Sequence, residues 1–299
     1  MPEGTTPIPV DRKTSPYIHS RSAPKGPRWT ETCRVDLYWP PVVRSITFQH
    51  PPNGYAMKSQ KPAPGTDETS HPRLSMGVEN YLLSIYQLQE EDVRVTPTQL
   101  ADRLRQLPEG EVLGATLPSV GAMLRRMVRD GLVETNRSKD VILTKSGLNE
   151  AEGMVRRHRL AKRMVVDLLG VPPHMAHAEA HRLEHAISPY LADKIDERLG
   201  HPTTCPFGHP IPGSGYSPGG NAKPLSQMPT GSTAIVDRVP DQDQELLQYF
   251  VENGLMPGLR VEVVEAAPYR GVVRLDCDGA EVVVSYEVAE RIWAALDKG

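Results

Sequence analysis

Residues 116–147 read TLPSVGAMLRRMVRDGLVETNRSKDVILTKSG, and this segment indicates the architecture most directly. Pro118 stands at an expected first helical position, and the apolar residues after it recur at helical spacing until Gly131, a natural end for a helix. Residues 132–143 then predict two short strands around a polar turn at 136–140. A helix followed by such a hairpin is typical of the second half of a winged helix-turn-helix.

Two more helices are predicted upstream of this segment. VENYLLSIYQLQEE at 78–91 places its apolar residues on one stripe, as in an amphipathic helix. Pro97 opens a second helix, TQLADRLRQL, and the polar, glycine-containing loop LPEGEVLGA separates that helix from the third. Three helices and a hairpin in this order predict a winged-helix DNA-binding domain over residues 75–146.

Composition divides the rest of the chain. Residues 1–74 are rich in Pro, Arg, Ser, Thr and Gly without a period, which predicts a disordered extension. Residues 147–202 predict three helices with more apolar surface than a monomer needs, hence a dimer interface. A Gly/Pro-rich linker follows at 203–224, and alternating strands around one helix at 225–299 predict a small, partly open β-barrel. The expected fold is mainly α with a small β part.

The overall composition limits the classes of function. The chain has 299 residues and a formal charge of -3, so contact with DNA must come from a localised patch rather than from bulk charge. Its three cysteines, Cys33, Cys205 and Cys277, are too widely spaced for a disulfide framework or a CxxC metal clip, which fits a reducing cytoplasm. No apolar run approaches the roughly 20 residues that cross a bilayer, so no membrane partner is expected.

The run HAEAHRLEH contains the candidate ligands of a metal site. On a helix, His177, His181, Glu184 and His185 fall on one face. Neutral imidazole and carboxylate suit divalent first-row ions such as Fe(II), Mn(II) and Zn(II), whereas a calcium or magnesium site would be built of oxygens. The alternative is a solvated or hydrogen-bonded histidine face, but four donors on one stripe favour a metal.

Several motifs occur together and in a specific order. They are ENYLLSIYQL at 79–88, MVRDGLV at 127–133, RRHRLAKRMVVDLLG at 156–170, HAEAHRLEH at 177–185 and CPFGHPIPG at 205–213. With them the chain resembles the iron- and manganese-dependent repressors related to the diphtheria toxin repressor. The resemblance implies a winged-helix domain, a helical metal-binding and dimerisation domain, a C-terminal SH3-like, FeoA-like domain, and operator binding that depends on metal.

The resemblance also implies a set of metal ligands. Those of the primary site would be His181, Glu184, His185 and, on the first helix, Asn80, whose amide oxygen is only a weak, neutral ligand. Those of a second site would be His158 and His177. Asp243 lies near the place where the C-terminal domain of the family can contribute an oxygen.

Lys162 departs from the family pattern, because the second site expects an acidic residue there, one turn after His158. A lysine repels a cation held by His158 and His177. We therefore expect either one metal per subunit or a rearranged set in which His158 joins Glu184 and His185. Histidine at 181 lacks the soft thiolate of iron-type members, so the cofactor is expected to be Mn(II) or Fe(II), with the choice left open.

The DNA contacts are expected on the helix at 117–129 and on the wing. Residues 94–139 contain eight Lys/Arg against five Asp/Glu, a net charge of +3, so useful affinity needs a homodimer on a pseudo-palindromic double-stranded operator. By resemblance the helix N-terminus carries the contacts, although Thr116 has an alternative role as a helix cap. The candidate residues are Thr116, Pro118, Ser119, Gly121, Arg125, Arg126, Arg129 and Lys139. Gly121 and Ala122 cannot bond bases through side chains, so phosphate contacts and shape should dominate.

Three functions are open at this stage. In the first, a cation joins the winged helix to the dimerisation helices and favours the DNA-binding pose, which makes the chain a repressor that senses cytoplasmic metal and controls metal homeostasis genes. The second is a zinc hydrolase with Glu179 as general base, against which stand the upstream winged helix and the lack of an HExxH motif. The third is a metal-independent transcription factor. We do not expect an enzyme.

Overall fold

The computed structural model describes residues 74–107, 114–216 and 221–297. The extension expected to be disordered, residues 1–74, lies outside these ranges apart from its last residue. Most of the loop LPEGEVLGA lies outside them as well.

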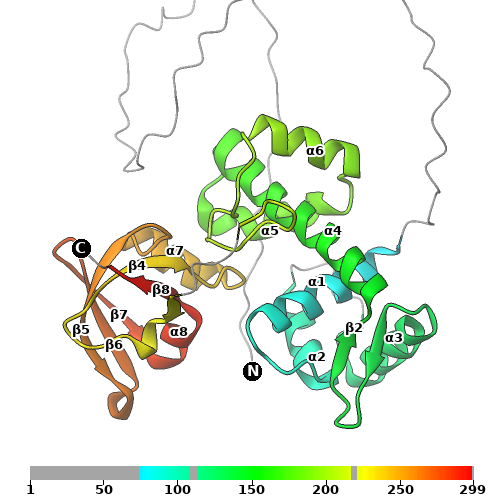
Figure 1. Ribbon diagram of the computed structural model, residues 1–299, viewed down its shortest axis with the longest axis horizontal. Coiled ribbons are helices and arrows are strands. Elements are labelled where there is room, and N and C mark those ends of the chain that lie inside the picture. Colours follow the sequence, from blue (N-terminus) through cyan, green and yellow to red (C-terminus); the bar gives the residue numbers. More distant parts are fainter. Residues whose placement is uncertain (1–73, 108–113, 217–220, 298–299) are drawn as a thin grey trace, which may run out of the picture. The chain divides into compact units, whose positions relative to one another are not determined.

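Three helices and a two-stranded hairpin form the first part of the described chain (Figure 1). Each of the last two helices begins at a threonine cap, where Thr96 accepts a hydrogen bond from the Gln99 amide and Thr116 accepts one from the Ser119 amide. The elements are α1 (Met76–Glu90), α2 (Pro97–Arg105), α3 (Leu117–Arg129), β1 (Val133–Thr135) and β2 (Val141–Leu143). The predicted winged helix-turn-helix is therefore present.

The winged helix has an apolar core of its own, to which α1, α2, α3 and both strands contribute. Its junction with the next helix requires a glycine. A Cβ on Gly147 would lie 1.8 Å from the backbone oxygen of Leu132, well inside van der Waals contact. The close approach lets the helix after the wing begin directly beneath the hairpin, with Thr144 as its cap.

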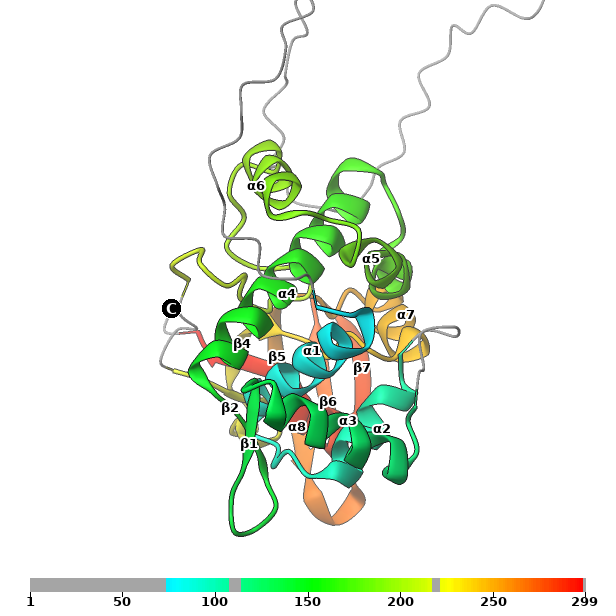
Figure 2. The same cartoon turned by 90° about the vertical axis from the view of Figure 1, so that its right-hand side faces the viewer.

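A second group of helices follows the wing. Its elements are α4 (Lys145–Arg163), the π-helical η1 (Met164–Leu168), the 3-10 helix η2 (Pro173–Met175), α5 (Ala176–Glu184) and α6 (Pro189–Arg198). Helix α4 packs against α1 and also against α5 and α6, as Figures 1 and 2 show. Because α4 covers a second face of α1, the polar residues Glu79, Asn80 and Gln87 of α1 are buried. The sequence pattern had indicated only one buried stripe there.

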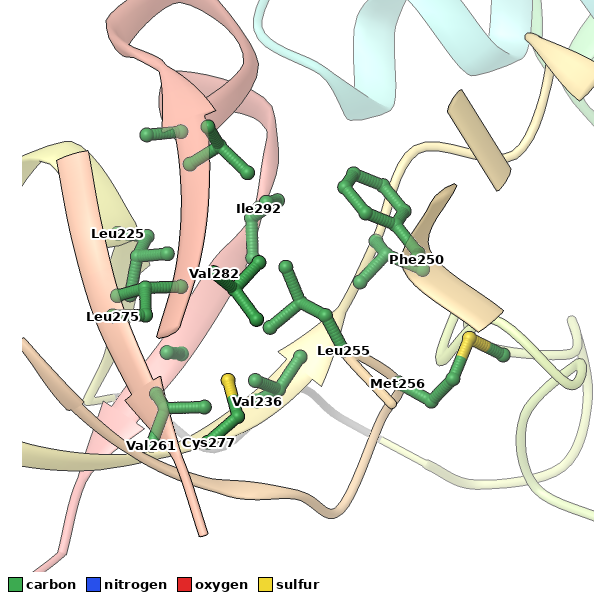
Figure 3. Close-up of a cluster of buried hydrophobic side chains, with 14 of the residues drawn as sticks. Leu225, Val236, Phe250, Leu255, Met256, Val261, Leu275, Cys277, Val282 and Ile292 are labelled. Carbon is green, nitrogen blue, oxygen red and sulfur yellow. The ribbon is translucent and has the colours of Figure 1, made fainter. Parts of the chain in front are cut away.

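The C-terminal part is a six-stranded antiparallel sheet of order β3-β8-β4-β5-β6-β7 with two α-helices. Its α-helices and strands are β3 (Ala222–Pro224), β4 (Thr233–Arg238), α7 (Gln244–Glu252), β5 (Arg260–Ala267), β6 (Val272–Cys277), β7 (Ala280–Ser285), α8 (Tyr286–Arg291) and β8 (Trp293–Leu296). Side chains of the sheet and of α7 meet in one core (Figure 3), to which Val236, Phe250 and Leu275 belong. Strands β4 to β7 and α7 match the sequence prediction, whereas β3, α8 and β8 were not foreseen.

The expected fold class, mainly helical with a small β part, is confirmed. Within the described ranges, no helix combines the length and the apolar character that a membrane crossing requires.

Candidate metal centre

Four histidines and a glutamate gather where α4 and α5 pack together. His158 lies on α4, His177, His181 and Glu184 lie on α5, and His185 follows directly as the C-cap of α5. The rings are 5.4 Å apart between His158 and His177 and 5.9 to 6.0 Å apart for the other neighbouring pairs. All five side chains are buried, His158, His181 and Glu184 completely. The four residues of the HAEAHRLEH run therefore lie on one face of α5, as their spacing predicted.

His158, His181 and Glu184 form the tightest group. One ligand atom from each lies within 4.8 Å of the others, a separation that a single ion can bridge. The Glu184 carboxylate accepts a hydrogen bond from Nδ1 of His158 at one oxygen, while Nδ1 of His181 lies 2.7 Å from the other. His158 thus lies with Glu184, as in one of the two arrangements expected from Lys162.

His158 and His177 are both held in the neutral form, which is the form that binds a metal ion. Burial holds the pKa of His158 well below 6.5, and the nearby Lys162 ammonium acts in the same direction. Burial also lowers the pKa of His177 to about 3, again with help from Lys162. Both rings are thus neutral at pH 7. Since Nδ1 of His158 donates to Glu184, its Nε2 carries the lone pair, and this atom has no hydrogen-bond partner among the described residues.

His185 is held by a residue that sequence reasoning missed. Its Nδ1 donates to Glu79 of α1 at 2.7 Å, and the same carboxylate accepts a bond from Arg157 at 2.7 Å. The other ring nitrogen of His185, Nε2, lies 3.7 Å from Glu184 Oε1. A carboxylate behind a ligating imidazole fixes its tautomer and increases its basicity. Glu79 therefore orients His185 toward Glu184.

Asn80 lies beside Glu79 on α1 and is buried. Its side-chain oxygen has no hydrogen-bond partner in the described parts of the chain. Buried polar atoms are normally satisfied, so an unpaired oxygen here, like the unpaired Nε2 of His158, has the chemistry of a cation ligand. With the donor set of His158, His181 and Glu184, the unpaired Nε2 of His158 suits a divalent ion.

The second expected site does not have the composition of a metal site. His177 stacks on His181, but Lys162 points its ammonium at Asp241 Oδ2, 2.5 Å away, and both residues are buried. Asp243, the residue expected to contribute an oxygen from the C-terminal part, instead caps α7 by accepting a bond from the Leu246 amide at 3.0 Å. Asp241 thus enters this region in place of Asp243, as an ion-pair partner of Lys162.

The residues proposed for DNA contact lie at the start of α3 and on the wing. Thr116 caps α3, and its hydroxyl lies 2.8 Å from that of Ser119. Pro118 is the second residue of the helix rather than the first. Arg125 approaches the half-buried Gly121, and Arg126 lies 3.5 Å from Asp130. Lys139 is exposed at the tip of the wing and has a positive φ of 63°.

The sequence carried little indication of Glu79 or Asp241. Glu79 lies off the apolar stripe of α1 and is buried only because α4 covers that face. Asp241 is separated from Lys162 by 79 positions, and a pair at that distance leaves no periodic trace. The one indication in the sequence was Lys162. A positively charged side chain beside histidines that could bind a metal ion calls for a nearby carboxylate, which is Asp241.

Comparison with known proteins gives three successive family matches. Residues 73–141 match the N-terminal DNA-binding domain of iron-dependent repressors, and residues 144–213 match the metal-binding and dimerisation domain of the same proteins. Residues 223–296 match the FeoA domain.

The similarity also extends over nearly the full length of known proteins. The chain is 35% identical to the iron-dependent repressor IdeR of Mycobacterium leprae (strain TN), over 72% of this chain and 94% of the relative. It is 28% identical to the diphtheria toxin repressor of Corynebacterium glutamicum, over 72% and 93%. A manganese-dependent transcriptional repressor in complex with manganese has a similar structure, with a TM-score of 0.65, 33% identity and coverage of 74% of this chain and all of the other. The chain belongs to the family of iron-dependent repressors that includes the diphtheria toxin repressor.

Proposed function

We propose that the chain is a transcriptional repressor that binds its operator when Mn(II) or Fe(II) occupies the site around Glu184. The supporting observation is the buried set of His158, His181 and Glu184, whose ligand atoms lie within 4.8 Å of one another, together with the unpaired Nε2 of His158, a ring that burial keeps neutral. We assign His181, Glu184, His185 and His158 as ligands, Asn80 as a weak ligand, and Glu79 as the residue that orients His185. The bound cation would supply the positive charge that lets these groups share one buried site.

The placement of these residues couples the site to DNA. Glu79 and Asn80 belong to α1 of the winged helix, whereas Glu184 and His185 belong to the end of α5. Side chains that meet around one ion fix α1 against α5 and so select one pose of α3. A pose selected in this way favours DNA binding by a coupling free energy of typically about 1–3 kcal/mol. Control of metal homeostasis genes in the cytoplasm is the expected output.

Contacts with the operator are assigned to the exposed surface of α3 and to the wing. Of the candidates, Thr116, Pro118, Ser119, Arg125, Arg126, Arg129 and Lys139 are exposed. Their chemistry suits phosphate oxygens more than base edges, because the readout positions near Gly121 carry little side chain. The winged helix is assigned to residues 75–146, the metal-binding and dimerisation helices to 147–202, the linker to 203–224 and the FeoA-like domain to 225–299.

A homodimer fits the surface of the helical region. Within the described residues its helices expose large apolar side chains that a monomer would leave in water: Leu168, Leu169, Met175, Leu183, Tyr190 and Leu191. Two recognition helices on one duplex also give the affinity that a net charge of +3 cannot supply alone. The relatives support neither of the alternatives, a zinc hydrolase or a metal-independent transcription factor.

A mobility shift on DNA from upstream of the chain's own reading frame tests this function. Wild-type protein should bind with Mn(II) or Fe(II) and lose the complex with chelator, and Glu184→Gln should bind equally weakly in both. Glu179→Gln is the matched control, because Glu179 lies on the same helix, partly exposed, and pairs with Arg182 instead of a histidine. Equal binding by the wild type with and without metal would contradict the proposal.

A further inference from the structure

Lys162 and Asp241 form a buried ion pair next to the metal-binding histidines. The Lys162 side chain is 1% exposed and that of Asp241 is 3% exposed, and the ammonium lies 5.6 Å from the ring centre of Phe207. Burial tends to raise the pKa of Asp241, but Lys162, together with smaller contributions from His209 and His177, outweighs it and holds that pKa well below its usual range. Asp241 is therefore ionised, and its carboxylate pairs with the Lys162 side chain in a region closed to water.

The ammonium is also close to the second pair of histidines. Lys162 lies one helical turn after His158 on α4, and the His158 ring lies 5.4 Å from the ring of His177. His158 has its Nδ1 committed to Glu184, and Asp241 is committed to Lys162. A divalent ion at His177 would therefore lack a carboxylate and would face a fixed positive charge in a medium of low dielectric constant, where like charges repel strongly.

Resting on the function proposed above, we infer that Lys162 is an internal cation in place of a second metal ion. Each chain then takes one divalent ion, and the FeoA-like domain stays bound to the helical domain whether or not metal is present.

The contacts of the FeoA-like domain support the second half of this inference. Asp241 lies in the connection between β4 and α7, and α7 packs against η2. Val165 of η1 and Ala176 of α5 belong to the same buried apolar cluster as the sheet residues, including Val236. The attachment thus combines apolar packing with one buried ion pair, and the Lys162 to Asp241 bond needs no metal ligand to complete it.

Metal content separates this inference from the proposed function. Equilibrium dialysis of the full chain against Mn(II) should give one ion per chain for the wild type and close to none for Glu184→Gln. Two ions in the wild type, with one kept in Glu184→Gln, would overturn the inference and leave the proposed function intact. No bound ion in the wild type would overturn the proposed function and, with it, the inference.

Charge reversal at Lys162 tests the cause. Lys162→Glu should raise the content from one to two Mn(II) per chain, because it replaces the repelling charge with a carboxylate beside Asp241 and His177. A Lys162→Glu protein that still takes one ion would contradict the assignment. Lys194→Glu is the control, since Lys194 is exposed on α6 and pairs with Glu197, and it should leave the content at one.

Hydrogen exchange measures the attachment itself. In wild-type protein, amides of residues 160–176 and 236–247 should be protected equally with Mn(II) and with chelator. In Lys162→Glu the same amides should lose protection in chelator and regain it with Mn(II). Wild-type protection that appears only with Mn(II) would overturn the inference, and this arm stands even if the variant fails to fold.

Discussion

His158 and Lys162 lie one helical turn apart on α4, and the groups around them balance charge in opposite ways. Around His158, imidazoles and the Glu184 carboxylate gather within reach of one ion, and Nε2 of His158 has no hydrogen-bond partner among the described residues. Around Lys162, an ammonium and the Asp241 carboxylate neutralise each other within the chain. In the proposal made above, the first group takes its cation from solution, whereas the second has its cation within the chain. A regulator built in this way can respond to metal at one place while its domains hold together at another.

Removal of the internal cation should have the largest effect. Lys162→Met keeps a stem of similar length but leaves the Asp241 carboxylate buried without a partner, so the free energy of unfolding of metal-free protein should fall by about 3–5 kcal/mol. Urea denaturation followed by circular dichroism measures this change. The double variant Lys162→Met/Asp241→Leu should recover most of the loss, and Lys194→Met, on an exposed surface, should show none. If Lys162→Met were as stable as the wild type, the ion pair with Asp241 would not stabilise the fold, and the proposed difference between the two regions would be wrong.

Arg159 on α4 forms another ion pair within the chain, and the stability that this pair contributes should depend on pH. Glu90 of α1 pairs with the buried Arg159 and lies 3.6 Å from Nδ1 of His209. Burial tends to raise the pKa of Glu90, but His209 and Arg159 together outweigh it and bring that pKa to about 2. A folded-state pKa below the unfolded value of 4.5 means that Glu90 stabilises the fold above pH 4.5 and that this contribution disappears as the pH falls toward 2.

Glu90→Gln should therefore lower the stability of metal-free protein by about 2 kcal/mol at pH 7. The gap between the variant and the wild type should narrow between pH 4.5 and pH 2 and close below that, as measured by urea denaturation at each pH. A gap that stays constant down to pH 2 would show that the charge of Glu90 contributes nothing.

A smaller effect is expected at the candidate metal centre, on the affinity for Mn(II), when Glu79 can no longer orient His185. Glu79→Gln leaves Nδ1 of His185 with a neutral acceptor, and loss of such a supporting carboxylate typically weakens metal binding by about 10-fold or somewhat more. Competition with a fluorescent Mn(II) chelator measures the affinity. Glu150→Gln, an exposed position on α4, serves as control. An unchanged Mn(II) affinity in Glu79→Gln would show that Glu79 acts only as a partner of Arg157.

Local patterns were enough to predict most of the fold. Helix-start prolines, the stripe of α1 and the two short strands around a polar turn predicted the winged helix, and alternation predicted β4 to β7. The short strands β3 and β8 escaped because AKP and WAAL, at three and four residues, have too little alternation to be recognised. Their strand character comes from pairing with each other and of β8 with β4.

The part of the candidate metal centre that lies on one helix was predictable. The shared face of His177, His181, Glu184 and His185 follows from their spacing alone, and Lys162 gave a reason to expect a different arrangement at His158. The residues that complete the picture come from other elements: Glu79 from α1 and Asp241 from the β4–α7 connection. Contacts of this kind depend on how elements pack, and the choice of Asp241 over Asp243 depends on which of two nearby carboxylates is used to cap α7.

The coupling between metal and operator is tested most directly by reciprocity. Fluorescence anisotropy gives the affinity of wild-type protein for its labelled upstream DNA with and without Mn(II), and electron paramagnetic resonance of free Mn(II) gives the metal affinity with and without that DNA. A site that links α1 to α5 should raise both affinities by the same factor, within about 5- to 150-fold, and by none in Glu184→Gln. Equal DNA affinity in saturating Mn(II) and in chelator would contradict the account.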